Sequence, residues 1–178
     1  MLVVSYGNRA VDDTFLEMAD VLAEGGFVPV ALGSFVAHHS LMTNVAAGRP
    51  DADDLAAVRA LAAQVVEKLA HVDGAEAARV AAVPGNRPYR AFGGVAFKPE
   101  VNAGACTACG LCARACPTGA ITIADAAATD AGLCVSCFRC VAVCPEGARS
   151  IGGGAELQAA RDAFAQRCAA RQESWFSL

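Results

Sequence analysis

The feature that most constrains this chain is a pattern of cysteines that occurs twice, 28 residues apart. Each copy reads C-x-x-C-x-x-C-x-x-x-C-P. The first copy holds Cys106, Cys109, Cys112 and Cys116, and the second holds Cys134, Cys137, Cys140 and Cys144. The framework recurs as well, in the pairs Pro117 and Pro145, Gly119 and Gly147, Ala120 and Ala148, and Ile123 and Ile151. A repeat that keeps both the cysteines and their framework predicts a pseudo-two-fold unit with two equivalent sites.

The spacing of the cysteines indicates an iron–sulfur ligand set. Three cysteines at successive three-residue intervals let a tight loop surround one 4Fe-4S cluster, while the fourth ligates the other cluster. We therefore assign one cluster to Cys106, Cys109, Cys112 and Cys144, and the second to Cys134, Cys137, Cys140 and Cys116. The proline after each fourth cysteine fixes φ and turns the chain away. A zinc module is disfavoured, because its thiolates commonly come as two C-x-x-C pairs with a longer spacer.

Residues 100–152 closely resemble the bacterial two-cluster ferredoxins in the eight cysteines, the two prolines and the Gly-Ala that follows each. The resemblance implies an α+β domain and one-electron transfer at low potential, between redox protein donors and acceptors. Arg114 and Arg139 lie inside the ligand loops. They could tune a cluster potential, or they could face solvent and meet an acidic partner.

Composition narrows the class of protein. The formal net charge of −4 argues against a nucleic-acid binder, which usually shows a basic patch. The chain shows no targeting segment and no run of roughly 18–20 apolar residues that could span a membrane. We expect a cytoplasmic protein, in which cysteines serve metal rather than disulfides. We also expect sensitivity to oxygen, since exposed clusters are often oxidised and lose iron.

The first 73 residues read as strand, helix, strand, helix, which favours a parallel α/β layer. The strands are expected at residues 2–5 and 27–32, and Pro29 should place the second strand at a sheet edge. The first helix follows Asp12 or Asp13, carries Phe15, Met18, Ala19 and Leu22 on one face, and ends at Gly25-Gly26. Residues 33–50 are expected to be irregular. The second helix starts at Asp51 or Asp53 and carries Leu55, Val58, Ala62, Val65 and Leu69 on one face.

Four regions follow from these patterns: an α/β region at 1–73, a connector at 74–99, the cysteine domain at 100–152 and a helical tail at 153–178. The tail has helical composition over 155–171 and should pack back on one of the domains. Its Cys168, the ninth cysteine, is most simply a small core residue.

Residues 2–90 resemble the later half of the flavodoxin-like domain found in bacterial flavodoxin–ferredoxin fusion proteins. The similar pieces are Tyr6-Gly7-Asn8-Arg9, Asp12-Asp13, Gly26-Phe27, His39-Ser40, Gly48-Arg49-Pro50-Asp51 and Pro84-Gly85-Asn86. The resemblance implies a partial flavodoxin-like layer of two parallel strands and two helices, in which Tyr6, Gly7, Asn8 and Arg9 would flank the ring of FMN. The phosphate loop of that family has no counterpart here. The sequence is a truncated copy, or a second chain or a dimer mate completes the sheet. Where no further segment completes the sheet, residues 2–4 should be exposed. His38 and His39 read as part of a polar loop.

Three functions compete. The first is an electron carrier with two clusters and no substrate site, more an electron-transfer protein than a catalyst. The second is an iron–sulfur flavoprotein oxidoreductase, in which the clusters feed an FMN bound with a partner-supplied half. The third is a structural or sensing role. We favour the first, because the cysteine spacing supports it directly.

Overall fold

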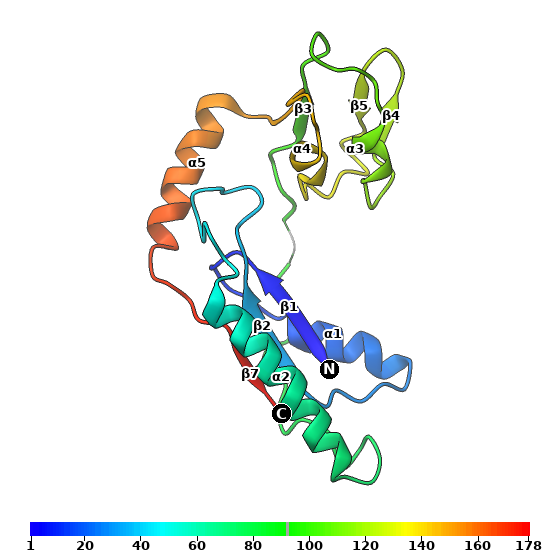
Figure 1. Cartoon of the computed structure of the whole chain (residues 1–178), viewed down its shortest axis with the longest axis vertical. Coiled ribbons are helices and arrows are strands. Elements are labelled where there is room, and N and C mark those ends of the chain that lie inside the picture. The colour runs from blue at the N-terminus through cyan, green and yellow to red at the C-terminus, as the bar shows by residue number, and fades with distance from the viewer. Residues whose placement is uncertain (92) are drawn as a thin grey trace. The chain divides into compact units, whose positions relative to one another are not determined.

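A computed structural model describes the whole chain except residue 92 and divides it into two compact units (Figure 1). Unit 1 comprises residues 1–39, 43–91 and 165–178, and unit 2 comprises residues 40–42 and 92–164. No helix among the described residues has the length and apolar character needed to cross a membrane.

Unit 1 is built on a three-stranded sheet in the order β1-β2-β7. The strands are β1 (Leu2–Tyr6), β2 (Leu32–Val36) and β7 (Trp175–Ser177). β1 and β2 run parallel, with Leu2 opposite Leu32, as the strand–helix–strand pattern predicts. β7 comes from the far end of the chain and pairs antiparallel with the other side of β2, with Trp175 opposite Ser34.

Two helices cover opposite faces of this sheet, because alternate residues of a strand point to opposite faces. On one face α1 (Thr14–Glu24) buries Phe15 and Ala19 against Leu2 and Leu32. On the other face α2 (Ala52–Ala70) buries Leu61 against Ala31 and Phe35. The predicted stripe of α1 is confirmed, since Met18 and Leu22 also pack on this core.

The second strand differs from its prediction. It spans Leu32–Val36, so residues 27–31 lie before it and the first part of the supposed irregular segment belongs to it. The expected edge position is also wrong, because β7 makes β2 the central strand. Pro29 precedes the strand and accepts a hydrogen bond from Val80 N instead. A pairing partner some 140 residues away leaves no local signal in the sequence.

The second helix begins where predicted, but the face that it buries is shifted from the predicted one. Asp51 is its N-cap and forms a capping box with Asp54. Leu55, Val58 and Leu69, which the periodicity placed on the core face, are 43%, 40% and 46% exposed. Val65 of the predicted stripe does pack beside the Leu61 core, so the prediction is right for this residue. α2 lies over β2 and β7 through the side that carries Leu61, which is turned away from Leu55, Val58 and Leu69.

Unit 2 repeats one strand–helix–strand motif. The first copy contains β3 (Pro99–Val101), α3 (Leu111–Arg114) and β4 (Ile121–Ile123). The second contains β5 (Ala127–Thr129), α4 (Arg139–Ala142) and β6 (Arg149–Ile151). β3 pairs with β6 and β4 with β5, both antiparallel, so each copy supplies one strand to each pair. This arrangement has the pseudo-two-fold character that the sequence repeat predicts.

The tail is only partly helical. α5 (Gly154–Arg167) ends four residues before the predicted boundary, and residues 168–174 lie outside any helix or strand before β7 begins. The last residues pack back on unit 1, as expected, but as a strand rather than as a helix.

Candidate metal centre

The two cysteine loops share one backbone conformation. Left-handed residues occur at matching places: Ala108 and Ser136 (φ 52° and 54°), and Gly110 and Phe138 (φ 74° and 56°). Each loop then enters its short helix, α3 or α4. Glycine adopts this conformation freely, whereas the buried Phe138 adopts it at some cost. The loop geometry therefore persists where the sequence repeat does not.

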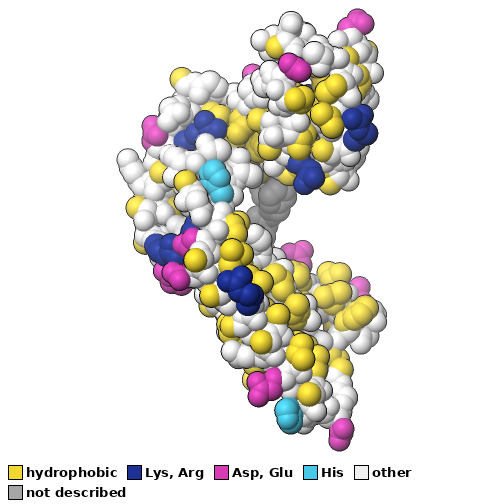
Figure 2. Space-filling model, in the orientation of Figure 1, with side chains coloured by type: hydrophobic (Ala, Val, Ile, Leu, Met, Phe, Trp, Pro, Cys, Tyr) yellow, Lys and Arg dark blue, Asp and Glu magenta, His cyan; other side chains and the backbone are white. Residues whose placement is uncertain are grey.

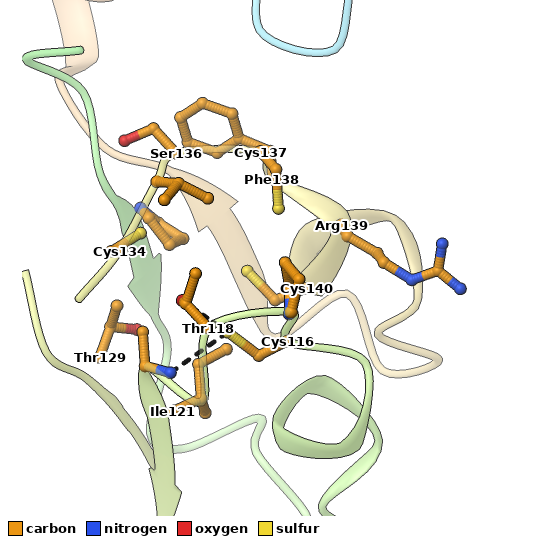
Figure 3. A pocket seen from close by; sticks show the side chains of 14 residues that line it. Cys116, Thr118, Ile121, Thr129, Cys134, Ser136, Cys137, Phe138, Arg139 and Cys140 are labelled. Atoms are coloured by element: carbon orange, nitrogen blue, oxygen red, sulfur yellow. Dashed lines mark hydrogen bonds between the residues drawn. The ribbon is translucent and has the colours of Figure 1, made fainter. Parts of the chain in front are cut away.

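The eight paired cysteines surround two hollows of similar size. The first hollow, of about 300 Å³, is lined by Cys106, Cys109, Cys112 and Cys144. The second hollow, of about 320 Å³, is lined by Cys116, Cys134, Cys137 and Cys140 and is shown in Figure 3. Each hollow thus receives three cysteines from one copy of the repeat and the fourth from the other.

The two hollows meet at a shared core. Cys112 of the first hollow and Cys140 of the second are 8% and 7% exposed, and they pack in one cluster with Ile121 and Ala127. Cys109 and Cys137, by contrast, are exposed. Each hollow therefore has a buried inner sulfur toward its neighbour and an exposed sulfur toward solvent.

Hydrogen bonds to sulfur favour the thiolate form that metal binding requires. Backbone N–H groups, foremost that of Ala108, lower the pKa of Cys106. Burial raises the pKa of Cys116, but hydrogen bonds from Thr118 and from the Ala120 N–H, 3.3 Å from its sulfur, outweigh burial and bring the pKa below its usual value. Burial raises the pKa of Cys140 in spite of a hydrogen bond from Arg149.

The cations around the hollows fall into two kinds. Arg114 and Arg139 are exposed, and Figure 3 shows the Arg139 guanidinium pointing away from the cysteines. Lys98 and Arg149, the inner cations, are less exposed: Lys98 is half-buried and its Nζ donates to Cys134 O at 2.8 Å, and Arg149 is 4% exposed. Sequence reasoning missed both inner cations. The sequence did contain a signal for Arg149: it is charged, whereas the equivalent residue in the first copy of the repeat is the aliphatic Ile121.

The donor set fits a polynuclear cluster. Four thiols line each hollow, backbone N–H groups donate to the sulfurs of Cys106 and Cys116, and the buried Arg149 guanidinium lies beside them. Within the described chain, no three His, Cys, Asp or Glu side chains converge closely enough to hold a single metal ion. A cluster of four irons keeps its ligands farther apart than one zinc ion does.

The residues predicted to flank FMN lie at the end of β1, where they make contacts within the protein. Asn8 is buried, and its amide donates to Cys168 O and Ala170 O, both at 2.9 Å, and accepts from Gln172 N. Arg9 forms an ion pair with Asp12. Tyr6 is the last residue of β1. The hydrogen bonds of Asn8 therefore hold the C-terminal segment 168–172 against the end of β1 within unit 1.

The other sequence candidates lie nearby. A β-carbon on Gly7 would come 2.6 Å from the His39 ring, so this ring packs directly against the Gly7 backbone. Burial, and then the neighbouring His38, lower the pKa of His39. His38 Nε2 lies 2.8 Å from Thr43 O. Cys168 is buried, as expected of a small core residue.

Comparison with known proteins identifies one region of the chain. A search of curated proteins found no match to the chain. Residues 105–148 match the family described as a 4Fe-4S dicluster domain, and all eight cysteines of the repeat fall within that match. This part of the chain is therefore an iron–sulfur domain of the ferredoxin type.

Proposed function

We propose that the chain transfers single electrons at low potential through two 4Fe-4S clusters. The observation that carries the proposal is the grouping of eight cysteines, four around each of two hollows. When bound, such clusters supply a reversible one-electron couple. An iron–sulfur domain of this type works with redox partners, and the function is that of a carrier rather than of a catalyst.

The proposed ligand sets cross between the two copies of the repeat. Cys106, Cys109 and Cys112 hold one cluster together with Cys144 from the second copy. Cys134, Cys137 and Cys140 hold the other together with Cys116 from the first copy. The lining of the two hollows supports this assignment.

The burial of the sulfurs supports a route for the electron. Exposed Cys109 and Cys137 give a docked partner close approach to each site. Buried Cys112 and Cys140 pack in one core cluster and bring the two sites together. We infer that electrons enter and leave near the exposed cysteines and pass between the sites across this shared core.

Anaerobic reconstitution tests the proposal. We expect about eight iron and about eight sulfide per chain, brown absorbance, and two reversible one-electron reductions. About four iron per chain would limit the protein to one cluster. Stoichiometric zinc in place of iron, or clusters that cannot be reduced reversibly, would contradict electron transfer.

A second candidate function, a flavoprotein oxidoreductase fed by the clusters, is favoured by one observation. Among the described residues no strand pairs with the outer edge of β1. We infer that a further segment, from another chain or a second copy, extends the sheet there. FMN would then bind near residues 6–9, with its phosphate held by the added segment.

A further inference from the structure

Arg149 is the place where the two halves of unit 2 differ most in chemistry. It is the first residue of β6, and the equivalent first residue of β4 is Ile121. Both side chains are buried, at 4% and 7% exposure. A full positive charge therefore occupies a position that the other half of the repeat fills with an aliphatic side chain.

The guanidinium lies between the two cysteine groups. Its Nη2 donates to Thr129 Oγ1 at 2.6 Å and to Cys140 Sγ, a sulfur of the second hollow, at 3.5 Å. The side chain also lines the first hollow beside Cys106, Cys109, Cys112 and Cys144. Arg149 thus contacts both sites at once.

Two of the three guanidinium nitrogens have no hydrogen-bond partner among the described residues. Nε and Nη1 are buried and make no hydrogen bond in the part of the chain that the structure describes. No described carboxylate forms an ion pair with Arg149 either. A guanidinium does not lose its proton in a protein, and a buried charge is costly unless it is paired. A negatively charged group next to Arg149 would therefore offset the cost of burying its charge.

We propose that Arg149 is the internal counter-ion of both cluster sites and raises their reduction potentials, most strongly at the site of Cys140. The proposal rests on the two-cluster function proposed above. A 4Fe-4S cluster with four thiolates is negatively charged, and reduction adds one more negative charge. A buried cation favours the reduced form, and hydrogen bonds to the sulfurs also set cluster potentials.

A second cation adds to the same asymmetry. Lys98 Nζ donates to Cys134 O at 2.8 Å and to Ser136 Oγ at 3.0 Å, and the equivalent residue in the repeat is Ala126. Both inner cations therefore contact residues that line the second hollow. Arg114 and Arg139 are exposed, where water and salt screen their charge. We therefore expect the first electron added to the protein to reside mainly on the cluster at the site of Cys140.

The test compares potentials in two neutral variants and one exposed control. Arg149→Ile carries the residue that the repeat itself uses, and Arg149→Gln has polar character and no charge. Arg139→Gln removes a charge of the same type from the solvent side. After iron and sulfide are counted, both potentials are measured by a redox titration followed by electron paramagnetic resonance.

We expect both potentials to fall in the Arg149 variants, with the larger fall at the higher-potential site, and to stay nearly unchanged in Arg139→Gln. Fully loaded Arg149 variants with wild-type potentials would overturn the inference, as would an equal fall in Arg139→Gln. If neither neutral variant loads iron, Arg149→Lys decides. Loading restored by lysine supports a counter-ion, and failure of lysine as well assigns Arg149 a purely structural role. A wild-type chain without two clusters would instead refute the proposed function.

Discussion

At the scale of single residues, Asp54 shows how one buried carboxylate joins distant parts of unit 1. It forms a two-pronged ion pair with Arg49 and accepts a hydrogen bond from Ser174 Oγ at 2.6 Å. It also accepts from Asp51 N at the start of α2. The Arg49 guanidinium, more than any other neighbour, holds the pKa of Asp54 far below its usual range.

We expect Asp54→Ala to lower the free energy of unfolding of unit 1 by about 3–5 kcal/mol, because the buried Arg49 guanidinium loses its two-pronged partner and keeps only the longer ion pair with Asp51, at 3.3 Å. Fluorescence of Trp175, the single tryptophan and a residue of β7, reports unfolding of this unit in urea. The matched control is Asp53→Ala, an exposed neighbour in the same helical turn, which should change stability by less than about 0.5 kcal/mol. Equal effects of the two variants would contradict this role of Asp54.

The same carboxylate predicts a pH dependence. Folding lowers the pKa of Asp54, so the ionised carboxylate adds to the free energy of unfolding. This contribution is complete above the pKa of the unfolded chain, about 4, and is lost as the pH falls toward the pKa of the folded protein. Between about pH 5 and pH 2 the wild-type unit should therefore lose more stability than Asp54→Asn, which cannot titrate there. Parallel pH profiles of the two proteins, followed by Trp175 fluorescence, would refute this assignment.

At the scale of elements, the proposed crossing of the ligand sets makes a prediction that can be tested with pairs of substitutions. Removing Cys116 and Cys134 together should destroy one cluster, since both belong to the second hollow, and about half of the iron should remain. Removing Cys106 and Cys116 together should destroy both clusters. Alanine substitutions and iron analysis after anaerobic reconstitution give the answer.

The control for these variants is Cys168→Ala, which lies in unit 1 and should keep the full iron content. If each repeat held its own cluster, the outcomes would be reversed: the Cys106 and Cys116 pair would keep half of the iron, and the Cys116 and Cys134 pair would keep little.

At the scale of the whole molecule, unit 1 presents an uncovered face. Val3 lies opposite Gly33, whose α-carbon faces Leu61 of α2, so Val3 is on the α2 side of the sheet, where it is 45% exposed. Several apolar residues of α2 are also 40–70% exposed, namely Leu55, Val58, Val66 and Leu69. Figure 2 shows hydrophobic side chains gathered over this part of the unit. A strand edge that no described strand covers, beside exposed apolar surface, is typical of places where another strand can pair.

We expect this chain alone to release no flavin on acid treatment, and to bind FMN only when another segment completes the sheet at β1. Absorbance of the released supernatant and light scattering over a range of protein concentrations check both points. A dimer that Val58→Glu disrupts would identify a second copy as the missing segment. A monomer that releases about one FMN per chain would contradict the expectation.

The cysteine loops were predictable because their determinants are local. Ligand spacing, the following proline and the Gly-Ala pair all lie within one short segment, and a 28-residue offset relates the two copies. The first strand, α1 and the Asp51 cap were predictable for the same reason, since periodicity and capping act over a few residues.

Tertiary structure alone decided which surfaces became interior. The pairing of β7 with β2 made a supposed edge strand central, and the packing of α2 on the sheet buried Leu61 while most of the predicted apolar stripe stayed exposed. Asp54 and Ser174 lie 120 residues apart, and Arg149 reaches Thr129 of another strand pair. The sequence by itself determined the chemistry of the cysteine sites, because ligands come from short loops. The positions of the buried charges depended on long-range packing, because only the folded chain decides which side chains are taken out of water.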